Sequence, residues 1–69
     1  MIDYDEIARF LMMKVRGVPD RGLPGEVTEA ISNYRKADDE ETMHQAKRRL
    51  RELAFMFSDS PAWNSEWLP

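Results

Sequence analysis

The sequence predicts an all-α protein, a small antiparallel three-helix bundle with a short fourth helix at its C-terminal end. Apolar residues recur every three or four positions in three segments, which is the period of an amphipathic helix. No segment alternates apolar and polar residues, the pattern typical of a half-buried strand. The connections between the segments are short, so consecutive helices are expected to pack antiparallel.

The first helix is expected over residues 4–16. Asp3 can cap its free amides, and Gly17 suits the left-handed position that often follows a helix. Phe10 and Met13 point away from the inward-facing side of this helix, so they need a second surface to bury against. The inward-facing stripe consists of Tyr4, Ile7, Ala8, Leu11 and Val15.

The second and third helices are expected over residues 24–37 and 39–57. Pro24 is tolerated in a first helical turn, where its nitrogen has no helical partner to lose. Asp38 and Asp39 both stand where a side chain can cap the third helix. The apolar stripes are Val27, Ala30, Ile31 and Tyr34 in the second helix, and Met43, Ala46, Leu50, Leu53, Ala54 and Phe57 in the third.

Residues 17–23 contain two glycines and a proline, and they are expected to form a loop. A fourth, short helix is expected over residues 61–67. Ser60 is a capping residue, and Pro61 follows it at the first helical position. The whole chain, residues 1–69, is expected to fold as a single helical domain.

The composition limits both the sources of stability and the class of protein. The chain has no cysteine, so it can form neither a disulfide nor a thiolate metal site. A domain of this size buries only about 60% of its unfolded surface, so helix packing or association must stabilise it. No apolar run approaches the roughly 18 to 20 residues that span a bilayer. The N-terminal residues are acidic where a signal peptide is basic, so a cytoplasmic protein without membrane contact is expected.

Catalytic and metal-binding patterns are weak. Glu41 and His44 have the spacing found in di-iron carboxylate bundles, but that chemistry needs two such pairs and the chain has a single histidine. The serines lie in neither a nucleophile elbow nor a phosphate-binding loop. We therefore predict no enzymatic activity, no catalytic residue, no metal site and no cofactor.

The only basic cluster is Lys47, Arg48, Arg49 and Arg51. It indicates a contact with nucleic acid, a contact with an acidic protein, or a solvated helix face that pairs with Glu52. A helix-turn-helix protein presents the N-terminal end of its recognition helix to the bases. Here that end, residues 38–41, is acidic, and the net charge is −3, so nucleic-acid binding is disfavoured.

One short motif resembles a known family. The sequence Arg49-Leu50-x-Glu52-Leu53, followed by a tryptophan-bearing tail, resembles the small enterobacterial nucleoid modulators of the Hha type. The resemblance covers about a third of the chain, and the N-terminal half departs from it. It implies a binding function and assigns no role to any residue. A nucleoid-associated or nucleic-acid-binding regulator acting through the basic cluster is kept as the alternative function.

Trp63 and Trp67 stand four residues apart, so they either close the open end of the bundle or are exposed to a partner. Together with the other apolar residues outside the stripes, they exceed what three packed helices need. We therefore expect a small non-catalytic protein-binding module: an adaptor, inhibitor or regulatory subunit, a build common among phage and mobile-element products. A homodimer through the same face is the related expectation. The predicted partner-binding residues are Phe10, Met13, Arg48, Arg51, Phe55, Trp63 and Trp67.

Overall fold

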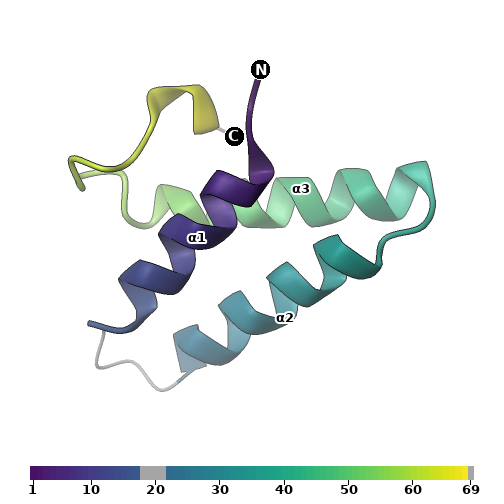
Figure 1. The fold of residues 1–69 in the computed structure, drawn as a ribbon, viewed down its shortest axis with the longest axis horizontal. Helices are drawn as coiled ribbons and strands as arrows, with labels where there is room; N and C mark the ends of the chain where they lie inside the picture. The colour runs from purple at the N-terminus through teal and green to yellow at the C-terminus, as the bar shows by residue number, and fades with distance from the viewer. Residues whose placement is uncertain (18–21, 69) are drawn as a thin grey trace.

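The computed structural model describes residues 1–17 and 22–68, and within them the fold is all-helical and contains no strand. Its elements are α1 (Tyr4–Val15), α2 (Gly22–Lys36), α3 (Glu40–Phe55) and a 3-10 helix, η1 (Ser65–Trp67). Each α-helix runs back against the one before it, and the C-terminal segment turns over the start of α1 (Figure 1). The predicted fold class is confirmed.

α1 begins as expected and ends differently. The Asp3 carboxylate accepts hydrogen bonds from the amides of Asp5 and Glu6, at 3.0 and 3.2 Å. The expectation of a left-handed residue at Gly17 is wrong, because Gly17 has no positive φ. The helix instead tightens at its end, where the Gly17 amide donates to the Lys14 carbonyl over 3.3 Å. A hydrogen bond between residues three apart satisfies a carbonyl at the helix end without a residue in the left-handed conformation.

α2 begins at Gly22, two residues before the expected start. Pro24 therefore occupies the third position of the first turn, where a helical amide still has no partner. Leu23, which was expected in the loop, is helical and buried in the core. Residues 18–21 of the expected loop lie outside the described residues.

α3 is capped by Asp39, whose side chain accepts a hydrogen bond from the Thr42 amide over 2.7 Å. Of the two candidate capping residues, Asp38 and Asp39, the one directly before the helix is used. The helix ends at Phe55, two residues before the expected end. Beyond it the Phe57 amide donates to the Ala54 carbonyl over 3.0 Å, the shorter-range bond of a 3-10 turn.

The fourth helix, expected over residues 61–67, is shorter than predicted. Ser60 does cap a turn, because its hydroxyl accepts from the amide two residues further on. Asn64 then adopts an extended backbone, and its side chain accepts from the Glu66 amide over 2.9 Å. This second cap restarts the chain as a single 3-10 turn, Ser65–Trp67, so the segment before it consists of turns.

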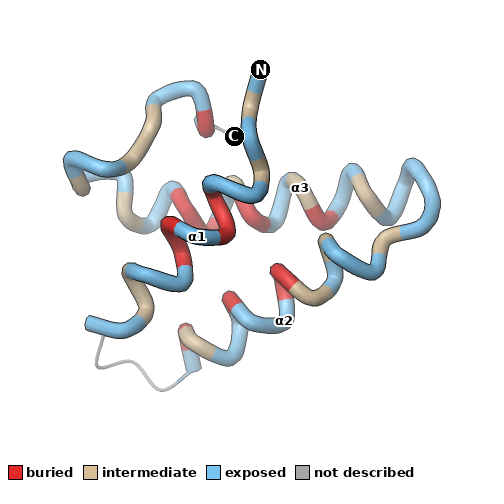
Figure 2. The backbone as a smooth tube through the Cα atoms, viewed as in Figure 1, coloured by how far each residue is buried: buried red, intermediate tan, exposed pale blue. Residues whose placement is uncertain are grey.

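The hydrophobic core lies between the three α-helices and is closed by the C-terminal segment (Figure 2). Trp67 is only 1% exposed, and its ring meets the Phe10 ring edge to face at 5.1 Å between centroids. The Phe57 ring also meets the Phe10 ring edge to face, with 6.2 Å between centroids. The tail therefore provides the second surface that Phe10 needs. The buried cluster is Ile7, Ala8, Phe10, Leu11, Leu23, Val27, Ala30, Ile31, Leu50, Leu53, Ala54 and Trp67.

Replacing Trp67 by alanine should destabilise the fold strongly. Loss of a buried tryptophan costs about 3 to 5 kcal/mol, a large share of the roughly 3 to 10 kcal/mol expected for a chain of this size. Urea denaturation followed by circular dichroism measures the loss. Trp63→Ala is the comparison variant and should lose less, because Trp63 is only half-buried. Equal losses for the two variants would contradict the closing role of Trp67.

The cap of α3 should make stability depend on pH. The Thr42 amide lowers the pKa of Asp39 below its ordinary value of 3.8. A lowered pKa means that this stabilisation is present above the ordinary pKa and is lost as the pH falls through the lowered one. Asp39→Asn keeps an acceptor but does not titrate. In urea denaturation below about pH 5, the wild type should lose stability relative to Asp39→Asn; parallel pH profiles would exclude the effect.

Candidate protein-binding surface

The structure separates the predicted partner-binding residues into two groups. Phe10 is 5% exposed and packs against Trp67, so neither ring is available at the surface. Met13 is exposed on α1 and lies with Ala62 in a shallow cleft of about 210 Å³ beside the tail. The remaining predicted residues, Arg48, Arg51, Phe55 and Trp63, lie on the second half of α3 and on the segment after it.

Phe55 and Trp63 form an aromatic pair at the C-terminal end of α3. Their rings meet edge to face, with 6.1 Å between centroids and 69° between planes. Phe55 is the last residue of α3, and 46% of it is exposed. The neighbouring Ala54 faces the core, so Phe55 points about 100° away from it. A turn returns the chain to this ring, and the Trp63 amide donates to the Ser60 carbonyl over 3.0 Å. The pair thus combines an open ring with a half-buried one.

Arg51 lies one helical turn before Phe55, on the same side of α3. Its side chain is half-buried, and its Nε is shielded from solvent with no hydrogen-bond acceptor among the described residues. The Trp63 Nε1 is shielded in the same way. Arg51, Phe55 and Trp63 are hereafter called the aromatic surface. It combines an aromatic pair with a cation that lies one helical turn before Phe55 and forms no ion pair with any described residue.

The other members of the basic cluster interact within the chain. Arg48 forms an ion pair with Glu52 at 3.2 Å. Arg49 lies 3.8 Å from both Glu52 and Glu26, and so links α3 to α2. Such exposed pairs contribute at most about 1 kcal/mol to stability, but they offset the positive charge of this helix face.

Lys47 is placed differently from the two arginines. Its Nζ lies 5.1 Å from the centre of the Tyr4 ring, a cation–π contact between α3 and the start of α1. The basic cluster is therefore not a continuous free patch, and its cations are directed to α1, to α2 and along α3. This arrangement fits the solvated, ion-paired helix face better than a surface for phosphate groups.

Glu41 and His44 are exposed in the first turns of α3. Among residues 1–17 and 22–68, no group of three or more histidine, aspartate or glutamate side chains is placed to hold a metal ion. None of the helices in this part of the chain has the length and apolarity needed to cross a membrane.

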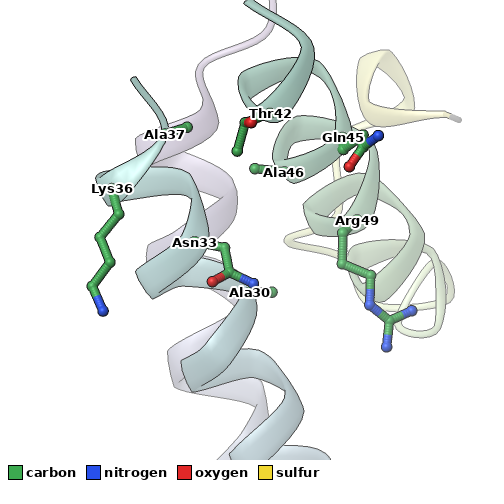
Figure 3. Close-up of a pocket in the computed structure, with 8 residues that line it drawn as sticks. All are labelled: Ala30, Asn33, Lys36, Ala37, Thr42, Gln45, Ala46 and Arg49. Atoms are coloured by element: carbon green, nitrogen blue, oxygen red, sulfur yellow. The ribbon is translucent and has the colours of Figure 1, made fainter. Parts of the chain in front are cut away.

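A cleft of about 240 Å³ lies between α2 and α3 (Figure 3). The small side chains of Ala30 and Ala46 form part of its wall, and Thr42 is directed into the space between the helices. Lys36 belongs to the rim, but its side chain extends away from α3. The cleft is present because alanine side chains at the contact between α2 and α3 are too small to fill the space. No aromatic residue that could anchor a partner lines it.

Sequence reasoning did not place three exposed apolar residues, Met12, Met56 and Leu68, in a site. Met12 lies outside the apolar stripe of α1, as Phe10 and Met13 do. The same helical periodicity could therefore have identified it. Met56 lies within the helix expected over residues 39–57, one residue beyond the observed end of α3, and Leu68 follows η1.

No protein-family model, curated protein or solved structure matches this chain. The likeness to nucleoid modulators therefore stays a resemblance of one short motif. The functional interpretation depends on the geometry of the aromatic surface and on the charges around it.

Arg51 should prove dispensable for folding. Arg51→Met keeps an unbranched apolar stem and removes the shielded Nε that has no described acceptor. The free energy of unfolding should stay unchanged or rise by up to about 1 kcal/mol. Arg49→Met is the matched control and should lose a few tenths of a kcal/mol, roughly the value of an exposed ion pair. A clear loss for Arg51→Met in urea denaturation would show that its guanidinium supports the fold.

Proposed function

We propose that this protein is a small non-catalytic protein-binding module, an adaptor, inhibitor or regulatory subunit, that contacts its partner through the aromatic surface. The observation that carries the proposal is the edge-to-face pair of the exposed Phe55 and the half-buried Trp63, with Arg51 one helical turn before Phe55. Tryptophan and arginine are the residue types most enriched at the energetic centres of interfaces. A chain without cysteine also suits the reducing cytoplasm.

The energetics favour a partner that is both apolar and acidic. Full burial of a phenylalanine side chain contributes about 1.5 to 3 kcal/mol, so covering the exposed half of Phe55 contributes about 1 kcal/mol. A carboxylate that accepts a hydrogen bond from Arg51 adds about 1.5 to 3 kcal/mol. Neither contribution alone gives a stable complex, so the partner must satisfy both groups. A second copy of the chain meeting the same surface is the homodimeric form of this proposal.

Nucleic-acid binding through Lys47, Arg48, Arg49 and Arg51 is the alternative, and ionic strength separates the two. Phosphate binding weakens steeply as the salt concentration rises, because the release of condensed counterions into a more concentrated solution is less favourable. An apolar contact with one charged pair responds weakly. The intramolecular ion pairs of Arg48 and Arg49 count against the alternative, because a phosphate must compete with Glu52 and Glu26 for them.

Phe55→Ser should weaken partner binding at least about fivefold, through the loss of about 1 kcal/mol of burial, without unfolding the chain. The substitution removes the exposed ring but leaves the core residues of α3 in place. Met56→Ser is the matched control: Met56 is 60% exposed, one residue further on, and turned about 100° around the helix axis. Tagged wild type and both variants are used in pull-downs from the source lysate, with and without nuclease. Circular dichroism verifies that each variant is folded.

A protein retained by the wild type and by Met56→Ser, with nuclease present, and retained in smaller amount by Phe55→Ser is the expected result. Retention that disappears on nuclease treatment would instead support the nucleic-acid alternative. Equal retention by all three proteins would place the binding surface elsewhere.

A further inference from the structure

We propose that the chain carries a second docking site, a cleft between α1 and α2 that binds an acidic amphipathic helix of another protein. The cleft has a volume of about 340 Å³. It lies on different helices from the aromatic surface, which belongs to α3 and the tail. It is hereafter called the Met12 cleft, and its lining residues are Met12, Thr28, Ile31, Ser32, Arg35 and Lys36.

The inner part of the Met12 cleft is apolar. Met12 projects from α1 with 48% of its surface exposed, because it points about 100° away from the fully buried Leu11. Ile31 of α2 is buried and forms the base. The Thr28 hydroxyl donates to the Pro24 carbonyl over 2.9 Å, so its only donor is used within α2. Methionine adapts its shape to different apolar side chains, which suits a position at the mouth of a docking cleft.

The rim of the Met12 cleft is cationic. Arg35 and Lys36 lie in the last turn of α2, and no carboxylate lines the cleft. Of the ion pairs between described residues, none uses Arg35 or Lys36, whereas Arg48 and Arg49 are both paired. Figure 3 shows the Lys36 side chain directed away from α3. The chain as a whole carries a net charge of −3, so two unpaired cations beside an apolar cleft favour an acidic ligand.

The shape of the cleft favours a helix as the occupant. Its α2 residues Thr28, Ile31 and Arg35 recur at intervals of three and four, so the cleft follows the α2 axis for about 10 Å. A helix laid along this line places an apolar side chain between Met12 and Ile31. Glutamates one turn away on the same helix then reach Arg35 and Lys36. With the aromatic surface on other elements, the module can bridge two proteins.

The test uses a synthetic helical peptide of leucine and glutamate, with leucine at every third and fourth position, and a copy in which lysine replaces glutamate. Methyl resonances of labelled methionines report the contact. The glutamate peptide should shift the Met12 signal in the wild type and to the same extent in Phe55→Ser, which lacks the exposed ring of the aromatic surface. Arg35→Glu should weaken binding at least tenfold, whereas Lys14→Glu, the same charge change on the opposite side of α1, should leave it unchanged. Phe55→Ser should bind as the wild type does, which separates this site from the aromatic surface.

A Met12 signal that does not move at millimolar peptide would overturn the proposal. Equal shifts with the lysine peptide would also overturn it, because the charges of the rim would then not discriminate between acidic and basic peptides. A dimer in sedimentation that Met12→Glu converts to a monomer would assign the Met12 cleft to a second copy of the chain and overturn the proposal.

Discussion

The packing of Trp67 against Phe10 is the contact on which the rest of the structure depends. A domain of this size without disulfides depends on a well-packed core of large apolar side chains. α1 directs Phe10 away from the stripe that meets the other helices, and the tail returns to cover it with a fully buried indole. Because Trp67 is held there and Phe57 also contacts Phe10, both ends of the intervening segment are anchored to the core.

This anchoring explains the aromatic surface. The segment between Phe57 and Trp67 is too short to leave the bundle, and its turns return Trp63 to the end of α3. Trp63 then contacts Phe55, which no other element covers. The exposed ring is therefore a consequence of closing the core with the tail, and it remains at the surface at a free-energy cost that a partner can remove. The core and the proposed interface thus share one structural cause.

Charge placement divides the cations into those used inside the chain and those left for other molecules. Arg48, Arg49 and Lys47 contact Glu52, Glu26 and Tyr4, and so tie α3 to itself, to α2 and to α1. Arg51, Arg35 and Lys36 form no ion pair with any described residue. Each of the two proposed surfaces holds some of these unpaired cations next to apolar side chains. Cations of this kind next to apolar side chains suit partners that combine carboxylates with apolar side chains.

The sequence alone determined the three α-helices and the starts of α1 and α3, because these depend on local chemistry: the apolar stripes of the helices and the capping carboxylates of Asp3 and Asp39. It also identified the surplus of apolar residues outside those stripes. Only the tertiary structure decided which of them are covered. Phe10 and Trp67 became core, whereas Phe55 stayed exposed and Leu23 moved from a loop into the core. Helical periodicity tells which side of a helix a residue occupies, but the covering element comes from a distant part of the chain, and local sequence does not encode that contact.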